Sequence, residues 1–259
     1  MSKTITRREA IKIGLAGVAG AVVAGSGALL GKELITNNMI MKKVIILNAS
    51  PRKTRNTASL LKEAKRGAEE AGAEVEYIDL VTMNYSGCMS CFACKRQPDR
   101  CGGLCAWKDE LRPLLERIHQ ADALIIGTPI YYSYPTAMFR AFIERLFFPI
   151  LNYVTFEPNL KKSMKTGIIY TMNNSEDRYK LVHYDAILAP DREYMEHYFG
   201  HCEVLNAFQT WQYLPTDPAL DSEPGDGESE WMRAKRRQRT EQWPKDLQAA
   251  FDMGRRFAE

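Results

Sequence analysis

The sequence predicts an α/β domain whose five parallel strands lie in the order 2-1-3-4-5, with helices on both faces of the sheet. Short apolar runs alternate with helical patterns from Met41 onward, which is typical of parallel sheets covered by helices. Polar loops follow the first and third runs, and in such a sheet ligands bind beyond the carboxyl ends of the strands, at the switch point beside the first strand. With 45% hydrophobic residues, the 259-residue chain can bury a substantial core.

Each expected element follows from its local pattern. The strands are short runs rich in apolar and β-branched residues, at Lys43–Leu47, Glu74–Ile78, Ala123–Gly127, Thr166–Thr171 and Glu203–Phe208. The helices are periodic stretches near Thr57–Ala71, Asp109–His119, Pro135–Phe148, Ile187–Phe199, Ser229–Gln238 and Pro244–Phe257. The domain is therefore placed at residues 41–259, with a cysteine-rich insertion at 86–106.

Three further stretches of the domain have a recognisable character. Residues 210–230 are rich in Pro, Asp, Glu and Gly, so we expect a long surface loop bordering the active site. The basic run 233–239 is interrupted by Ala and Gln and is interpreted as a solvated helix face. The apolar stretch 139–156 is either a buried helix with its trailing loop or a dimer interface. The net charge of +3 gives no case for nucleic acid as a partner.

Residues 1–40 differ from the rest of the chain. Arg7 and Arg8 precede a stretch without charge, 13–30, that is rich in Gly and Ala. This layout resembles a twin-arginine export leader, and its length is also near the minimum for a membrane anchor. Export to the periplasm or to the outer face of the membrane is expected. The alternative is a cytoplasmic protein whose translation starts at Met41.

The loop after the first strand carries the clearest sign of a ligand. Residues 48–57 (NASPRKTRNT) join a strand to a helix, where backbone N–H groups and the helix dipole favour a phosphate. Hydroxyl, amide and cationic side chains add donors, namely Ser50, Arg52, Lys53, Arg55, Asn56, Thr57 and Ser59. The loop has no glycine, which excludes the dinucleotide fingerprint and the nucleotide P-loop.

Three separated motifs carry a family resemblance. Residues 50–57 resemble the FMN-phosphate loop of the NAD(P)H-dependent FMN reductases and iron–sulfur flavoproteins, which have the flavodoxin-like fold. Residues 123–135 resemble that group's flavin-ring loop, and residues 244–257 resemble its C-terminal helix. The resemblance implies that Ser50, Arg52, Asn56 and Thr57 bind the FMN phosphate. Contact with the flavin ring is expected from Thr128, Pro129, Ile130, Tyr131 and Tyr132, with Thr171 and Met172 on its other flank.

Five of the six cysteines lie close together, at Cys88, Cys91, Cys94, Cys101 and Cys105. Such short spacing suits an iron–sulfur cluster, and zinc also accepts four thiolates. The family resemblance implies a [4Fe-4S] cluster, whereas free thiols or disulfides remain the alternative. The spacing favours Cys101 as fourth ligand, and the family's pattern favours Cys105. The sixth cysteine, Cys202, is expected in the core.

The predicted function is that of an FMN-dependent oxidoreductase. The flavin supplies the chemistry, so no catalytic side chain is expected. NAD(P)H is the implied donor in the cytoplasm, and a quinol, cytochrome or other redox protein would replace it outside. The alternatives are a flavodoxin-like electron carrier without enzymatic activity and a zinc-stabilised interaction module. The acceptor is open, and a homodimer or higher homo-oligomer is expected.

Overall fold

The computed structural model describes residues 41–160, 162–212 and 229–259, all of which fall in one compact unit. The expected leader at 1–40 and most of the expected surface loop, 213–228, lie outside the described residues. Across the described ranges, no helix has the length and apolar character needed to cross a membrane.

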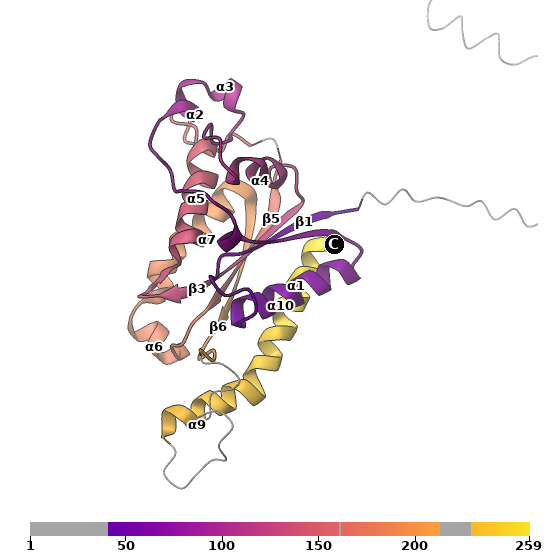
Figure 1. The fold of residues 1–259 in the computed structure, drawn as a ribbon, viewed down its shortest axis with the longest axis vertical. Coiled ribbons are helices and arrows are strands. Elements are labelled where there is room, and N and C mark those ends of the chain that lie inside the picture. Colours follow the sequence, from indigo (N-terminus) through magenta and orange to yellow (C-terminus); the bar gives the residue numbers. More distant parts are fainter. Residues whose placement is uncertain (1–40, 161, 213–228) are drawn as a thin grey trace, which may run out of the picture. The chain divides into compact units, whose positions relative to one another are not determined.

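Five parallel strands form the sheet in the order β2-β1-β3-β5-β6, which confirms the predicted order (Figure 1). They are β1 (Lys43–Asn48), β2 (Glu74–Asp79), β3 (Ala123–Tyr131), β5 (Met164–Thr171) and β6 (Gly200–Ala207). A two-residue strand, β4 (Tyr134–Pro135), pairs antiparallel with the end of β3. This pairing extends β3 four residues past its predicted end, as far as Tyr131.

The two faces of the sheet are covered by different helices. One face is covered by α1 (Asn56–Glu70) and α10 (Trp243–Ala258), and the other by α4 (Leu111–Ile118), α5 (Ala137–Ile150) and α7 (Tyr184–Phe199). The remaining helical elements are a 3-10 turn (Leu80–Thr82), α2 (Ala93–Arg96), α3 (Pro98–Cys101), α6 (Glu176–Leu181), α9 (Glu230–Arg237) and a π turn (Gln238–Gln242).

Alternating side chains of the strands build a separate core on each face. In β1, Val44 and Ile46 belong to the core formed with α1 and α10. Their neighbours Ile45 and Leu47 belong to the core formed with α4, α5 and α7, which also contains Cys202 as expected. The two cores explain why these strands are apolar on both faces.

The shortest helices were not predicted. The helices α2, α3 and α6 have only four to six residues, too few for a helical period to show in the sequence. The expected helix 187–199 begins earlier, at Tyr184, because α6 and α7 are separated by a turn at His183 with positive φ.

Candidate functional site

A cavity of about 360 Å³ lies at the carboxyl ends of β1, β3 and β5. Its volume falls in the range of small-molecule and cofactor pockets. The lining comes from the loop after β1, the end of β3, the loop after β5 and the segment after β6. The lining residues are Ser50, Arg52, Arg55, Asn56, Thr57, Pro129, Ile130, Tyr131, Thr171, Met172, Asn173, Thr210 and Gln212. Nine of the eleven residues predicted to bind the cofactor are therefore brought together here.

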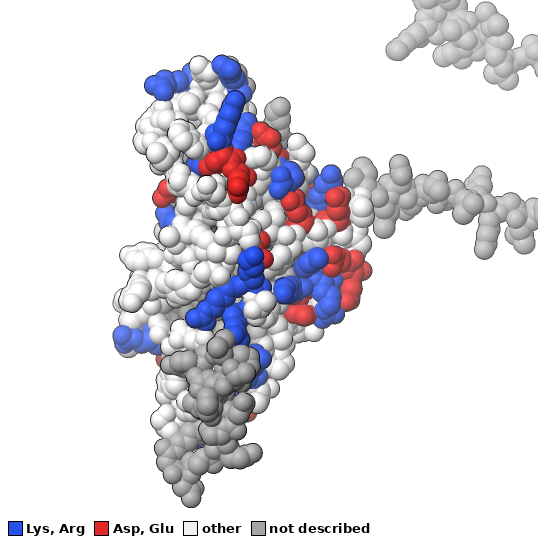
Figure 2. Space-filling view, in the orientation of Figure 1, with Lys and Arg blue, Asp and Glu red and all other residues white. Residues whose placement is uncertain are grey.

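The loop after β1 is shaped by its own polar side chains. The Ser50 backbone N–H donates to Asn48 Oδ1 at 3.0 Å, and the Arg52 N–H donates to Ser50 Oγ at 3.1 Å. The helix α1 then begins without a side-chain cap at Arg55. Its first N–H groups are free of capping side chains and favour an anion. Figure 2 shows Lys and Arg side chains gathered over the place where α1 begins in Figure 1.

The side-chain donors of this loop bind protein acceptors in the present structure. Arg52 Nη1 donates to the Gln212 carbonyl at 2.8 Å, and Asn56 Nδ2 donates to the Trp211 carbonyl at 2.6 Å. The Thr57 hydroxyl shares a 2.8 Å hydrogen bond with the Thr171 hydroxyl. A phosphate in this loop would therefore compete with backbone carbonyls for two of its donors.

Two of the residues predicted to contact the flavin ring do not line the cavity. Thr128 is fully buried, and its hydroxyl accepts from the Thr136 N–H at 3.2 Å. Thr128 thus supports the wall from behind. Tyr132 is fully exposed, because the tight β3–β4 connection places Tyr132 and Ser133 at positive φ. Neither residue lines the cavity, so contact of Thr128 and Tyr132 with a flavin ring stays a prediction.

A buried lysine behind the cavity corrects the interpretation of the basic run 233–239. Lys235 on α9 is only 2% exposed. Its ammonium donates to the carbonyl and the side-chain oxygen of Asn173 and, at 3.1 Å, to the carbonyl of Thr210. The spacing of Trp231, Lys235 and Gln238 places them on one helix face, which was the available sequence signal.

The cysteine-rich insertion forms a second site. Cys88, Cys91, Cys94 and Cys105 line one mainly apolar cavity of about 10 Å³ together with Trp107 and Arg145. Cys101 is not part of this lining, and its Sγ lies 3.8 Å from the Ala93 carbonyl oxygen. Within the described ranges, no three His, Cys, Asp or Glu side chains are placed to hold a metal ion. The donor set suits an iron–sulfur cluster, but the thiols would have to rearrange to bind it.

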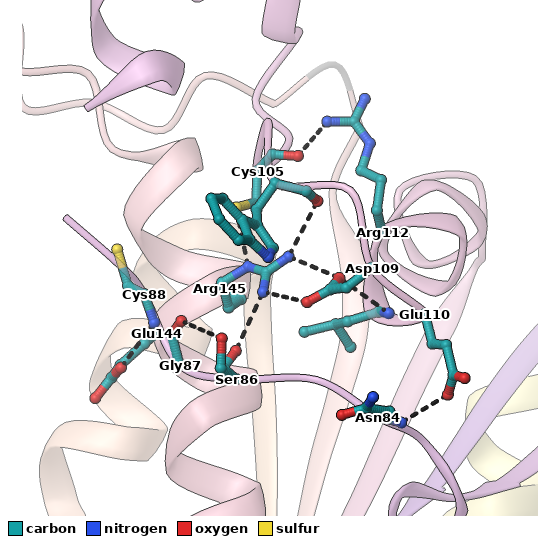
Figure 3. A network of polar contacts seen from close by, with 12 residues as sticks. Asn84, Ser86, Gly87, Cys88, Cys105, Asp109, Glu110, Arg112, Glu144 and Arg145 are labelled. Atoms are coloured by element: carbon teal, nitrogen blue, oxygen red, sulfur yellow. Dashed lines mark hydrogen bonds and ion pairs between the residues drawn. The ribbon is translucent and has the colours of Figure 1, made fainter. Parts of the chain in front are cut away.

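Arg145 on α5 holds Cys105, the last cysteine of this site, in place through a hydrogen bond (Figure 3). Its guanidinium Nε donates to Cys105 Sγ at 2.9 Å, and the other nitrogens form a bidentate pair with Asp109 at 2.8 and 3.0 Å. The remaining two N–H groups reach the carbonyls of Ser86 and Trp107. Burial raises the pKa of Asp109, but its hydrogen bond with Arg145 and that residue's charge outweigh burial and hold the pKa below its usual value.

Other side chains also tie the insertion to α5. The Cys88 N–H donates to Glu144 Oε2 at 3.1 Å. The Lys95 ammonium donates to the carbonyls of Phe148 and Leu151 at the end of α5, where the helix dipole favours a cation. Burial raises the pKa of the Cys94 thiol, and the neighbouring cysteines raise it further. The insertion is therefore a packed lobe with grouped thiols.

The comparisons with known proteins agree with this arrangement. Residues 42–167 match the family of NADPH-dependent FMN reductases, a stretch that contains the β1 loop, the cysteine lobe and the β3 wall. The chain is also similar to iron–sulfur flavoproteins of Methanocaldococcus jannaschii (32% identity) and Archaeoglobus fulgidus (35%), each over 103 residues. These matches cover 40% of this chain and 51% and 48% of those proteins, so the chain spans about half the length of the curated relatives it matches.

Solved structures resemble the chain over a longer stretch. An NAD(P)H:quinone oxidoreductase from Methanothermobacter marburgensis aligns with a TM-score of 0.59 at 17% identity, covering 85% of this chain and 98% of that one. An FMN-dependent NADH-azoreductase from Bacillus anthracis, in complex with FMN, aligns with a TM-score of 0.56 at 14% identity, covering 85% and 100%. These likenesses confirm the flavodoxin-like α/β fold.

Proposed function

We propose that this protein is an oxidoreductase that binds FMN in the cavity at the carboxyl ends of β1, β3 and β5. The observation that carries the proposal is the uncapped start of α1 beside Ser50, Arg52 and Asn56, at the edge of a cofactor-sized cavity. The match of residues 42–167 to the NADPH-dependent FMN reductases supports it.

The residues present fit FMN. The N–H groups at the start of α1, with Arg52, Asn56 and Thr57, would bind the phosphate, because this end of the cavity gathers donors and positive charge. The apolar side chains of Pro129, Ile130 and Met172 would flank the ring. Bound FMN would supply the chemistry of electron and hydride transfer, whereas the protein binds and orients it.

The direct test is a titration of flavin-free protein with FMN, followed by turnover with NAD(P)H and a quinone. We expect tight binding of FMN and repeated turnover. Failure to bind FMN would overturn the proposal. Binding of FMN with a single reduction and no turnover with small acceptors would replace it by the alternative, an electron carrier between proteins. A protein that binds zinc but no flavin would be the interaction module.

The finer assignment concerns the cysteine lobe. We place a [4Fe-4S] cluster at Cys88, Cys91, Cys94 and Cys105, because these four thiols line one cavity and Cys101 does not. The likeness to iron–sulfur flavoproteins supports this choice. Iron and sulfide analysis after anaerobic reconstitution tests it. Cys105→Ser should lose the iron, and the matched variant Cys101→Ser should keep it. Iron content near zero in the unmodified protein, or the reverse result in the two variants, would contradict the assignment.

The compartment and the oligomer complete the proposal. Arg7 and Arg8 with the uncharged stretch 13–30 support export by the twin-arginine route. Replacing both arginines by lysine should trap the protein in the cytoplasm. A cytoplasmic location of the unmodified protein would contradict export and make NAD(P)H, which serves as donor in the assay above, the expected physiological donor as well. The exposed apolar side chains Tyr153, Val154 and Phe156 support a homodimer, which sedimentation of the purified protein tests.

A further inference from the structure

The side chain of Lys235 is unusual because it is a buried cation whose described hydrogen-bond acceptors are all neutral. It is a nearly completely buried cation, and its three N–H donors reach Asn173 Oδ1, the Asn173 carbonyl and the Thr210 carbonyl. All three acceptors are neutral, and none of its hydrogen-bond partners among the described residues is a carboxylate. The Trp231 ring, one helical turn earlier, covers the ammonium at 5.5 Å from the ring centroid.

A buried charge whose hydrogen-bond partners among the described residues are all neutral is costly, so its retention calls for a compensating role. Burial lowers the pKa of Lys235 to about 8. Perturbed groups of this kind gather at functional sites, and both residues that Lys235 holds, Asn173 and Thr210, line the proposed FMN cavity. The lysine itself stands behind that wall.

The chain from Thr210 to Gln212, which we name the strap, is held by three side chains from three elements. The carbonyl of Thr210 accepts from Lys235, that of Trp211 from Asn56, and that of Gln212 from Arg52. The donors to Trp211 and Gln212 are the ones expected to turn to a phosphate. When they do, Lys235 still holds the strap from α9.

The strap is also tied to the loop after β5. The Thr210 N–H and hydroxyl both donate to the Met172 carbonyl, at 2.9 and 3.1 Å. Lys235 strengthens this connection, because its ammonium also donates to the carbonyl and the side-chain oxygen of Asn173 in the loop after β5. One ammonium thus joins two cavity walls that are about 37 residues apart in the chain.

We propose that Lys235 is a positioning residue of the cofactor site, which locks the strap to the loop after β5 and so fixes the cavity wall facing the ligand. This inference rests on the proposed FMN site. It assigns a role to α9, which lies beyond the part of the chain matched by the family model.

The first experiment needs no cofactor. Amide hydrogen exchange is measured in flavin-free protein for residues 172–174 and 209–212, in the unmodified chain, Lys235→Met, Lys235→Arg and the control Lys245→Met on the exposed side of α10. Lys235→Met should raise exchange at these amides by about tenfold or more, since the wall loses a set of charged hydrogen bonds. Lys235→Arg should restore most of the protection, and Lys245→Met should match the unmodified chain.

The second experiment titrates the same proteins with FMN and with riboflavin, which lacks the phosphate. Because Lys235 acts on the wall, Lys235→Met should weaken both ligands by a similar factor, about tenfold. A loss confined to FMN would overturn the proposal in favour of a direct phosphate contact. Unchanged exchange and affinity in Lys235→Met would also overturn it. If the unmodified protein binds no flavin, the proposed function fails, and the exchange experiment still decides the role of Lys235.

Discussion

Replacing Arg145 by Met should destabilise the protein more than any surface charge substitution. Arg145 is 1% exposed, and each of its five N–H groups has an acceptor. The substitution would leave the Asp109 carboxylate, whose side chain is only 13% exposed, without its partner. Breaking a buried ion pair from one side costs about 3–5 kcal/mol. For a domain of this size, each kcal/mol lowers Tm by about 2–4 °C, so a decrease of about 6–20 °C is expected.

The assay is thermal and denaturant unfolding of protein free of flavin and iron, so that cofactor loss does not enter the readout. The matched control is Arg117→Met, which breaks an exposed pair with Glu76 and should change stability by no more than about 1 kcal/mol. Adding Asp109→Asn to Arg145→Met should recover part of the loss, because the orphaned charge is removed. Equal midpoints for Arg145→Met and Arg117→Met would refute the reasoning.

The pH dependence gives a second check on the same pair. The folded-state pKa of Asp109 is lowered, so its contribution to stability is present above the unfolded pKa near 4 and is lost as pH falls through the folded pKa. The difference between the unmodified protein and Arg145→Met should therefore narrow below about pH 4. A difference that stays constant down to pH 2 would mean that packing, and not the charge pair, dominates.

Three further changes test other parts of the structure. The double variant Asn56→Ala/Thr57→Ala should weaken FMN by about 2–4 kcal/mol and riboflavin by less; full FMN affinity would contradict the phosphate assignment. Gly254→Ala should lower the free energy of unfolding, measured in urea, by about 3 kcal/mol, because the new Cβ would lie 1.8 Å from the Ala64 carbonyl oxygen. An unchanged urea midpoint would mean that α1 and α10 separate freely. Burial lowers the pKa of His119 in the folded protein to about 4, so the unfolded chain binds the proton first as the pH falls. The free energy of unfolding should therefore fall by about 3 kcal/mol between pH 6.5 and 4. His119→Gln should remove that slope, and its persistence would assign it to another group.

The sheet could be predicted because its strands carry strong local signals. The central strands β1 and β3 are apolar runs, and the core side chains of β1 alternate between the faces as the period of a strand requires. Alternation with helices indicates a parallel sheet, and the order of its strands came from the resemblance to proteins with the flavodoxin-like fold. The hairpin at Tyr134–Pro135 could not be predicted in this way, because a two-residue strand has no period and depends on pairing with β3.

The site could be predicted where it depends on strand ends and not where it depends on contacts distant in the chain. The loops at Ser50 and Pro129 follow strands, so their meeting point was implied by the topology. Thr128 is buried where it contacts Thr136, and the local sequence pattern does not predict this contact. Lys235 was interpreted as solvated because its helix is polar, and its burial arises from the distant residues Asn173 and Thr210.

The helix α5 connects the two proposed cofactor sites. At its start, Thr136 donates to the Ala49 carbonyl at 2.7 Å and caps the helix through the Phe139 N–H. Nine residues later, about 13 Å along the axis, Arg145 holds the cysteine lobe. Figure 1 shows the lobe with α2 and α3 at one end of α5 and the end of β3 near the other.

The packing of α5 also explains its apolar sequence without a partner chain. Phe139 and Phe142 are fully buried against the sheet, together with Leu146 and Ile150. The apolar side chains that remain exposed belong to the following loop, at Tyr153, Val154 and Phe156. The helix is therefore a core element that fixes both sites to the same sheet. A change that loosens α5 in the sheet should disturb flavin binding and the cysteine lobe together, whereas Arg145→Met acts at the lobe end and should leave the β1 loop in place.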